Sequence, residues 1–230
     1  TNYTNADLFT EIAMYITSVK TEMEERRFCL NEAAKHHVQL SESIEVIIGN
    51  RLENIAKQSG AHEAIKYFSG ITIKEKELAI VWLGKKCISV NEVKDFFPEL
   101  FDYMQVQPML TPNCMWLSSY IDEYKKAKLG NIYTDEIKTA ISEHNADSVA
   151  FDTWYQSLKT TRFLLAGRND IDVYYWIDGL GVEWIPFIQA ILAKHQQDNI
   201  YLNEVMVARA LLPTTTEVNK VELQHLSDVD

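Results

Sequence analysis

The spacing of apolar residues constrains the fold of this chain most strongly. Apolar residues recur three and four positions apart through most of residues 1–165. The first stripe of this kind consists of Leu8, Ile12, Ile16, Val19 and Met23. This spacing places apolar side chains along one face of an α-helix. We therefore expect one helix through residues 8–23 and an all-helical domain over residues 1–165.

Short polar residues mark several of the expected helix starts. Thr4 stands three positions before Asp7, Ser89 stands three positions before Glu92, and Thr134 precedes the helix-like segment DEIKTAISEH. A hydroxyl side chain at such a position caps the free N–H groups of the first turn, and an acid three residues later completes a capping box. These pairs predict helices that begin directly after Thr4, Ser89 and Thr134.

Aromatic and cysteine residues in the helical region are expected to be core residues. Trp116, Tyr120 and Tyr124 are spaced by four, and Trp154 adjoins Tyr155. Rings at this spacing are typical of the packed face of a helix. The cysteines have no neighbouring metal ligands, so we expect them to be buried as small apolar side chains.

The composition of the chain changes near residue 165. Residues 171–177 are rich in β-branched and aromatic side chains, which is typical of a buried strand. A helical segment follows, then a second apolar strand candidate after residue 199, then another helix start. The order strand, helix, strand, helix predicts a parallel α/β unit. We place a domain boundary there, so that residues 166–230 form the start of an α/β domain.

Asp178 lies where the first of these strands should end, and Gly179 and Gly181 follow it. Functional groups in open α/β sheets collect at the carboxyl ends of strands. A carboxylate there suits a divalent cation, because hard cations prefer oxygen ligands. The alternative is an aspartate that caps the next helix. The spacing is not that of a dinucleotide-binding turn, and Glu183 would repel a phosphate.

The segment LLPTTTEVNK at residues 211–220 is the second candidate for a functional site. Thr214 and Glu217 fit a capping box, which would place Thr215 and Thr216 in the first helical turn. The free N–H groups of that turn favour an anion, and a cation or base can activate a threonine hydroxyl. Asn219, one turn later, would donate to a developing negative charge. The alternative is that the threonines only cap the helix.

Together, YYWIDGLGVEWIPFI at residues 174–188 and ARALLPTTTEVNK at residues 208–220 point to a family. They resemble the PglZ proteins, which belong to the alkaline phosphatase superfamily and occur in BREX bacteriophage-defence systems. The resemblance is strong over residues 171 to about 222 and weaker over the helical segments before them. It implies an alkaline-phosphatase-like α/β domain with metal-dependent phosphatase or phosphodiesterase activity.

The resemblance also implies residue roles. Asp178 matches the first metal-ligand aspartate of the superfamily. The pattern P-x-x-T-x-x-N falls on Pro213, Thr216 and Asn219, which implies that Thr216 is the nucleophile and that Asn219 binds the oxyanion. Thr214 and Thr215 are the alternative nucleophiles. Asp178 and Thr216 would bind the same divalent ion, and zinc is the metal we expect.

The sequence departs from the superfamily pattern in one respect. The superfamily completes its two metal sites with further Asp and His residues downstream, whereas this sequence stops at Asp230. Only His195 and His225 follow residue 165, and neither is placed as a ligand from a later strand. We therefore expect a fragment that ends shortly after the nucleophile segment, holds half of a metal site and is inactive alone.

Composition limits the partners. The chain has 22 basic and 33 acidic residues, a net charge of −11, so it has no electrostatic affinity for a nucleic-acid backbone. A helix-turn-helix within residues 78–104 would present acidic side chains to DNA, and we expect no direct DNA binding. The three separated cysteines and the absence of a long apolar run indicate a cytoplasmic protein without membrane association.

The resemblance implies other defence-system proteins as partners, including a DNA methyltransferase. A non-catalytic scaffold or protein-interaction module of that complex is the alternative function. A helical adaptor without catalytic ancestry is the third.

Overall fold

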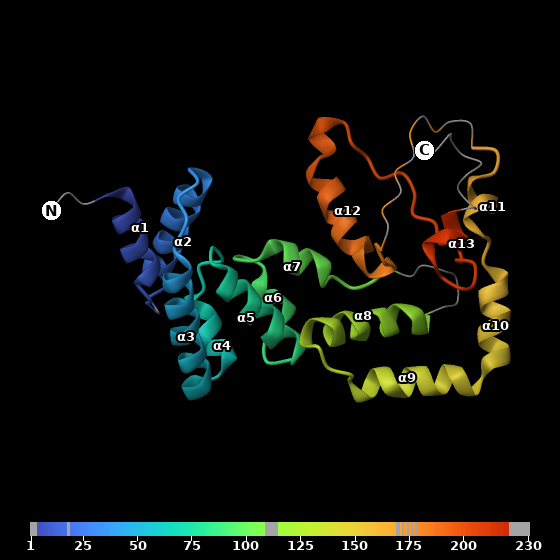
Figure 1. Ribbon diagram of the computed structural model, residues 1–230, viewed down its shortest axis with the longest axis horizontal. Helices are drawn as coiled ribbons and strands as arrows, with labels where there is room; N and C mark the ends of the chain where they lie inside the picture. Colours follow the sequence, from blue (N-terminus) through green and yellow to red (C-terminus); the bar gives the residue numbers. More distant parts are fainter. Residues whose placement is uncertain are drawn as a thin grey trace. The chain divides into compact units, whose positions relative to one another are not determined.

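A computed structural model describes residues 4–17, 19–108, 115–168, 171, 173, 175, 177 and 179–220 (Figure 1). The described part is mostly helical. The chain divides into two compact units. The first comprises Thr1–Gln105 and Tyr124–Tyr133, and the second comprises Val106–Glu123 and Thr134–Asp230. The predicted helical N-terminal region is thus shown, whereas the boundary at residue 165 stays a prediction.

The helices of the first unit alternate with short turns (Figure 1). Their bounds are α1 (Asn5–Met14), α2 (Lys20–Lys35), α3 (Glu42–Ser59), α4 (Ala61–Ala64), the 3-10 turn η1 (Ile65–Tyr67), α5 (Ile73–Gly84), α6 (Val90–Val93) and α7 (Pro98–Tyr103). Helix α8 (Met115–Gly130) begins in the second unit and ends in the first.

The second unit continues with helices of mixed length. Their bounds are α9 (Asp135–Ala146), α10 (Ser148–Ser157), α11 (Thr161–Leu165), η2 (Val182–Trp184), α12 (Ile185–Lys194), η3 (Gln196–Asp198) and α13 (Thr216–Lys220).

The caps predicted at three helix starts are confirmed. Thr4 accepts a hydrogen bond from the N–H of Asp7, and Thr134 accepts one from the N–H of Ile137. Ser89 forms the predicted capping box with Glu92. These local signals need no tertiary information, since each cap bonds to a backbone group within three residues.

The single helix predicted over residues 8–23 is wrong. Helix α1 ends at Met14 and α2 begins at Lys20. The last carbonyls of α1 are satisfied from elsewhere in the chain. Arg26 donates to the carbonyls of Ile12 (3.2 Å) and Ala13 (2.6 Å), and Arg51 donates to that of Met14 (3.1 Å). Because guanidinium groups cap these carbonyls, the helix can end within an unbroken apolar stripe.

The core of the first unit is an aromatic and aliphatic cluster. Phe68 lies 5.4 Å from the ring of Trp82 and 5.2 Å from that of Phe96, and Ile48 and Leu52 of α3 are fully buried. These contacts join α3, α5 and the turns around them.

Two glycines let α5 approach the end of α8 within the first unit. A Cβ at Gly84 would overlap the backbone of Gly130. The two helices therefore approach each other at backbone contact distance, which a larger residue at Gly84 would prevent.

The start of an α/β domain is not shown. Residues 171, 173, 175 and 177, which alternate through the first predicted strand, are in neither helix nor strand, and residues 200–208 of the second are irregular. The described residues contain one isolated parallel bridge, between Thr160 and Arg209, and no strand.

Two further expectations concern burial and membranes. Cys29 and Cys87 are exposed, so the prediction that they are buried is wrong. Cys29 follows Phe28 on the solvent side of α2, whereas Arg26 and Leu30 supply its buried face. Cys114 lies outside the described residues. Within the described ranges, no helix has both the length and the apolar character needed to cross a bilayer.

Candidate functional site

The turn predicted after Asp178 is present, although Asp178 itself lies outside the described residues. Gly179 has a φ of +71°, a backbone conformation that favours glycine. Gly181 has an ordinary negative φ, and its role is different. A Cβ there would overlap the carboxylate of Glu183, a side chain that is 7% exposed. Gly179 therefore turns the chain, and Gly181 makes room for the buried Glu183.

Gln107 holds this turn from a distant part of the chain. Its side-chain amide donates to the carbonyl of Val182 at 3.0 Å, and its backbone N–H donates to Asp122 at 3.0 Å. Gln107 is 2% exposed, so both bonds are protected from water. Sequence reasoning missed Gln107, because nothing in the spacing connects residues 107 and 182.

The segment before the predicted nucleophile is fixed on α10 and the turn that follows it. The N–H of Arg209 donates to the carbonyl of Lys159 at 3.0 Å, and the hydroxyl of Tyr155 donates to the carbonyl of Ala210. The guanidinium of Arg209 lies 5.4 Å from the ring centroid of Tyr155 and bonds to Gln156. These contacts place Arg209 and Ala210 against the end of α10.

Helix α13 begins at Thr216, which is exposed. Thr215, rather than Thr214, therefore precedes the first helical residue, one position later than the capping box predicted. The shift brings Thr216 to the helix start, and Thr214 and Thr215 are also exposed. All three hydroxyls remain candidates for the nucleophile.

Asn219 binds the loop that precedes its own helix. Its Oδ1 accepts from the N–H of Leu211 at 2.7 Å, and its Nδ2 donates to the carbonyls of Leu211 (3.2 Å) and Thr215 (3.1 Å). Both amide protons are therefore engaged with backbone oxygens. Donation to a phosphoryl oxygen, the predicted role, would require one of these bonds to open.

The potential metal-binding side chains that the structure describes do not form a metal site. In the ranges that the structure describes, no group of three or more His, Cys, Asp or Glu side chains is placed to hold a metal ion. Of the two predicted ligands, only the Thr216 hydroxyl is described. A hydroxyl and a carboxylate are suitable oxygen donors for a divalent cation, and two donors leave a four-coordinate site incomplete. The predicted meeting of Asp178 and Thr216 therefore stays a prediction.

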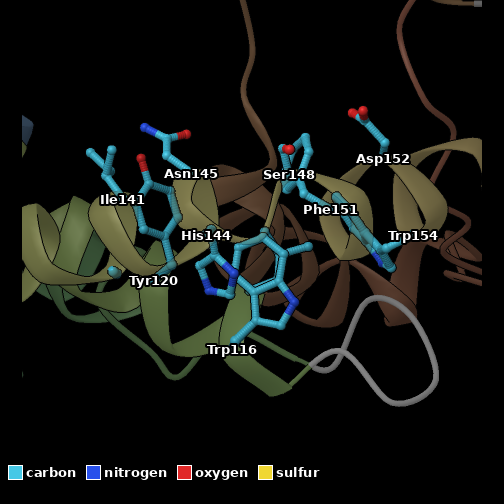
Figure 2. Close-up of a pocket in the computed structure, with 11 residues that line it drawn as sticks. Trp116, Tyr120, Ile141, His144, Asn145, Ser148, Phe151, Asp152 and Trp154 are labelled. Atoms are coloured by element: carbon cyan, nitrogen blue, oxygen red, sulfur yellow. The ribbon is translucent and has the colours of Figure 1, made fainter.

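The second unit also contains a cavity that the sequence did not predict. It has a volume of about 530 Å³ and lies between the start of α8, the end of α9, and α10. Its lining is mainly aromatic and apolar, with Asn145, Ser148 and Asp152 as polar members. Figure 2 shows Trp116 and His144 side by side in the middle, Tyr120 and Ile141 toward one end, and Phe151, Asp152 and Trp154 toward the other.

The aromatic residues of this cavity pack together, but they are not enclosed. The ring centroids of Trp116 and His144 are 3.8 Å apart, and those of Trp116 and Trp154 are 5.3 Å apart. Phe151 is nevertheless 38% exposed and Ile141 is 36% exposed. Of the rings predicted as core residues, Trp116, Tyr120 and Trp154 therefore form part of the wall of an open cavity. Tyr124 is exposed, so the prediction is wrong for it. The spacing of Trp116 and Tyr120 predicted that the two rings share one face of α8. It did not predict that the neighbouring helices leave this face partly open.

Comparison of the chain with protein-family models, with curated proteins and with solved structures found no match.

Proposed function

We propose that residues 171–220 supply a metal-binding acid and a nucleophile to a PglZ-type, metal-dependent phosphoric ester hydrolase of a BREX bacteriophage-defence system. One observation carries the proposal. The segment DGLG-EW and the segment LPTxTxxNK occur in this order and at the separation typical of the family, and either alone would be a weak signal. In this proposal, residues 166–230 begin an α/β domain, and residues 171–177 form its first strand.

The roles follow from the chemistry of the side chains. The Thr216 hydroxyl gives up its proton and attacks the phosphorus of a phosphoester, the P–O bond to the leaving group breaks, and the leaving group departs as an alcohol. Water then cleaves the threonine-linked intermediate, which releases the phosphate product and restores the hydroxyl. Asp178 and the Thr216 hydroxyl hold a divalent cation, zinc in the first instance. When bound, the cation lowers the pKa of the hydroxyl and stabilises negative charge on the phosphoryl oxygens. The exposure of Thr216 at the start of α13 supports its role as the attacking group.

Phosphodiester hydrolysis by the natural, full-length protein that contains this sequence tests the proposal. We expect hydrolysis of bis(p-nitrophenyl) phosphate only with an added divalent metal such as Zn²⁺ or Mn²⁺. The variant Thr216→Ala should lose activity by about a thousandfold or more, since removal of a nucleophile leaves only residual catalysis. The matched controls are Thr214→Ala and Thr215→Ala, which remove the same atoms from neighbouring positions.

The outcomes are distinct. Loss of activity in Thr214→Ala or Thr215→Ala alone would move the nucleophile to that residue. An intact protein that is inactive with every metal, or a fully active Thr216→Ala variant, would contradict the catalytic proposal.

The second candidate is a non-catalytic scaffold within the defence complex, with a DNA methyltransferase among its partners. The bonding of Asn219 favours it, because both amide protons are donated to the backbone carbonyls of Leu211 and Thr215. A scaffold would retain its partners in Thr216→Ala and would show no metal-dependent hydrolysis. Co-purification of the methyltransferase with the wild-type protein and this variant tests the scaffold role, and the metal-dependent hydrolysis assay distinguishes it from the catalytic one.

A further inference from the structure

We infer that the cavity between α8, α9 and α10 binds an arginine side chain presented by a basic segment of a partner protein. The cavity volume of about 530 Å³ lies in the range of small-ligand sites, so it can accept a guanidinium group and part of the chain that carries it.

The rings offer surfaces suited to a cation. Trp154 is inclined at 72° to Trp116 and at 56° to Phe151, with centroid separations of 5.3 and 5.5 Å. Rings in such inclined arrangements do not cover one another's faces fully, and Phe151 is 38% exposed. The face of an aromatic ring carries negative electrostatic potential, which attracts ammonium and guanidinium groups.

One end of this aromatic row already holds a guanidinium. Phe151 and Tyr155 are stacked, with centroids 6.5 Å apart and ring planes 9° apart. The guanidinium of Arg209 lies 5.4 Å from the centroid of Tyr155. The chain thus uses an arginine–aromatic contact beside the cavity, and Phe151, which is 38% exposed, offers its ring to a second one. Arginine suits these rings better than lysine does, since its planar group stacks on them.

The surrounding charge also selects a cation. Residues 115–157, which contain the three cavity helices, include seven acidic side chains and four lysines. Among the acids, Asp152 lines the cavity. In Figure 2 the carboxylate of Asp152 and the amide of Asn145 lie at the rim, above the rings. A guanidinium on the rings would therefore find a carboxylate at the rim as its ionic partner.

The segments that the structure does not describe contain no lysine and no arginine, so they cannot supply the cation. A basic segment of another protein fits this requirement, and the acidic chain, with a net charge of −11, would attract it at long range. The inference does not depend on the hydrolase proposal, because it uses neither Asp178 nor Thr216.

Titration of the chain with a short peptide of alternating arginine and glycine tests the inference, with calorimetry for affinity and the indole N–H resonances for location. We expect saturable binding that weakens with added salt and shifts the indole signals of Trp116 and Trp154 but not that of the buried Trp82. Conservative Trp→Phe variants assign these signals. The comparison peptides replace arginine with glutamate or with leucine.

Two conservative variants identify the contacts. Asp152→Asn, which changes an exposed side chain, should weaken binding about fivefold through loss of the rim carboxylate. Phe151→Leu keeps an apolar side chain but removes the ring face, and should weaken binding by a similar factor of about five. The matched control is Glu53→Gln on α3, which removes one exposed negative charge from the other unit and should bind as wild type.

Three outcomes would overturn the inference. The arginine peptide does not bind, the leucine peptide binds equally well, or both Asp152→Asn and Phe151→Leu bind it like the wild-type chain. The hydrolysis assay is unaffected by any of these results, so a failure here is separate from a failure of the proposed function.

Discussion

At the scale of single residues, the most consequential side chain of the first unit is Glu75, which is fully buried. Its carboxylate accepts hydrogen bonds from the N–H and hydroxyl of Ser69 (2.8 and 2.5 Å) and from the N–H of Gly70 (3.0 Å). It also completes a capping box with Thr72 at the start of α5. The Thr72–Glu75 spacing is a local sequence signal for this helix start.

Replacement of Glu75 by glutamine should lower the free energy of unfolding by about 3 kcal/mol. The amide would direct N–H groups at donors that now bond to a buried carboxylate. Chemical denaturation measures the effect. Glu77→Gln on the same helix removes an exposed partner of Lys74 and should change stability by less than about 0.5 kcal/mol. Equal stability of Glu75→Gln and wild type would contradict the assigned role.

Glu92 gives the first unit a pH dependence of stability. Burial raises the pKa of Glu92, but hydrogen bonds from His62 and from Ser89 outweigh it and bring the pKa below its ordinary value of 4.5. A carboxyl group whose pKa is lower in the folded state than in the unfolded state stabilises the folded protein at pH values above its unfolded-state pKa. This stabilisation is lost as the pH falls through the folded-state pKa.

We therefore expect the stability difference between wild type and Glu92→Gln to be full at neutral pH and to shrink below about pH 4.5. Denaturation curves across this range measure it, with Glu53→Gln as the exposed control. A stability difference between wild type and Glu92→Gln that grows as the pH falls would contradict this role of Glu92.

At the scale of elements, sequence reasoning succeeded where the determinant is local. The caps at Thr4, Ser89 and Thr134 depend on groups within three residues of each other, and all three were predicted. Sequence reasoning failed where residues far away in the chain determine where a helix ends. The end of α1 depends on Arg26 and Arg51, which cap its carbonyls from later helices.

For the candidate site, the sequence predicted the glycine turn at Gly179 and a helix start within one position of Thr216. It did not predict the packing of Arg209 and Ala210 on Tyr155, or the open aromatic cavity. Both arise from contacts between segments far apart in the chain, and residue spacing carries no information about such contacts.

The loop at residues 211–215 provides an element-scale prediction. Asn219→Ala would remove the three hydrogen bonds that the amide makes to Leu211 and Thr215, at a cost of about 1–3 kcal/mol in local stability. Hydrogen exchange at the Leu211 amide should accelerate by about tenfold or more, with little change in the first unit. Asn219→Asp is the matched variant, because it keeps the acceptor for the Leu211 N–H and loses only the donors. An unchanged exchange rate in Asn219→Ala would show that the loop is held by other contacts.

At the scale of the whole molecule, the chain divides into two compact units, and the candidate sites belong to the second. The first unit has a dense core around Phe68 and an internal carboxylate network around Glu75. The second unit contains the predicted nucleophile segment, the glycine turn and the aromatic cavity. The proposed chemistry and the proposed recognition of a basic partner both concern this second unit.

The central claim is that Asp178 and Thr216 hold one cation together. Anomalous diffraction from crystals of the natural, full-length protein grown with Zn²⁺ tests it most directly. The account predicts a metal peak with the Asp178 carboxylate and the Thr216 hydroxyl each at about 2.0–2.2 Å, and loss of that peak in Asp178→Asn. A metal bound elsewhere with these two side chains far apart would contradict it.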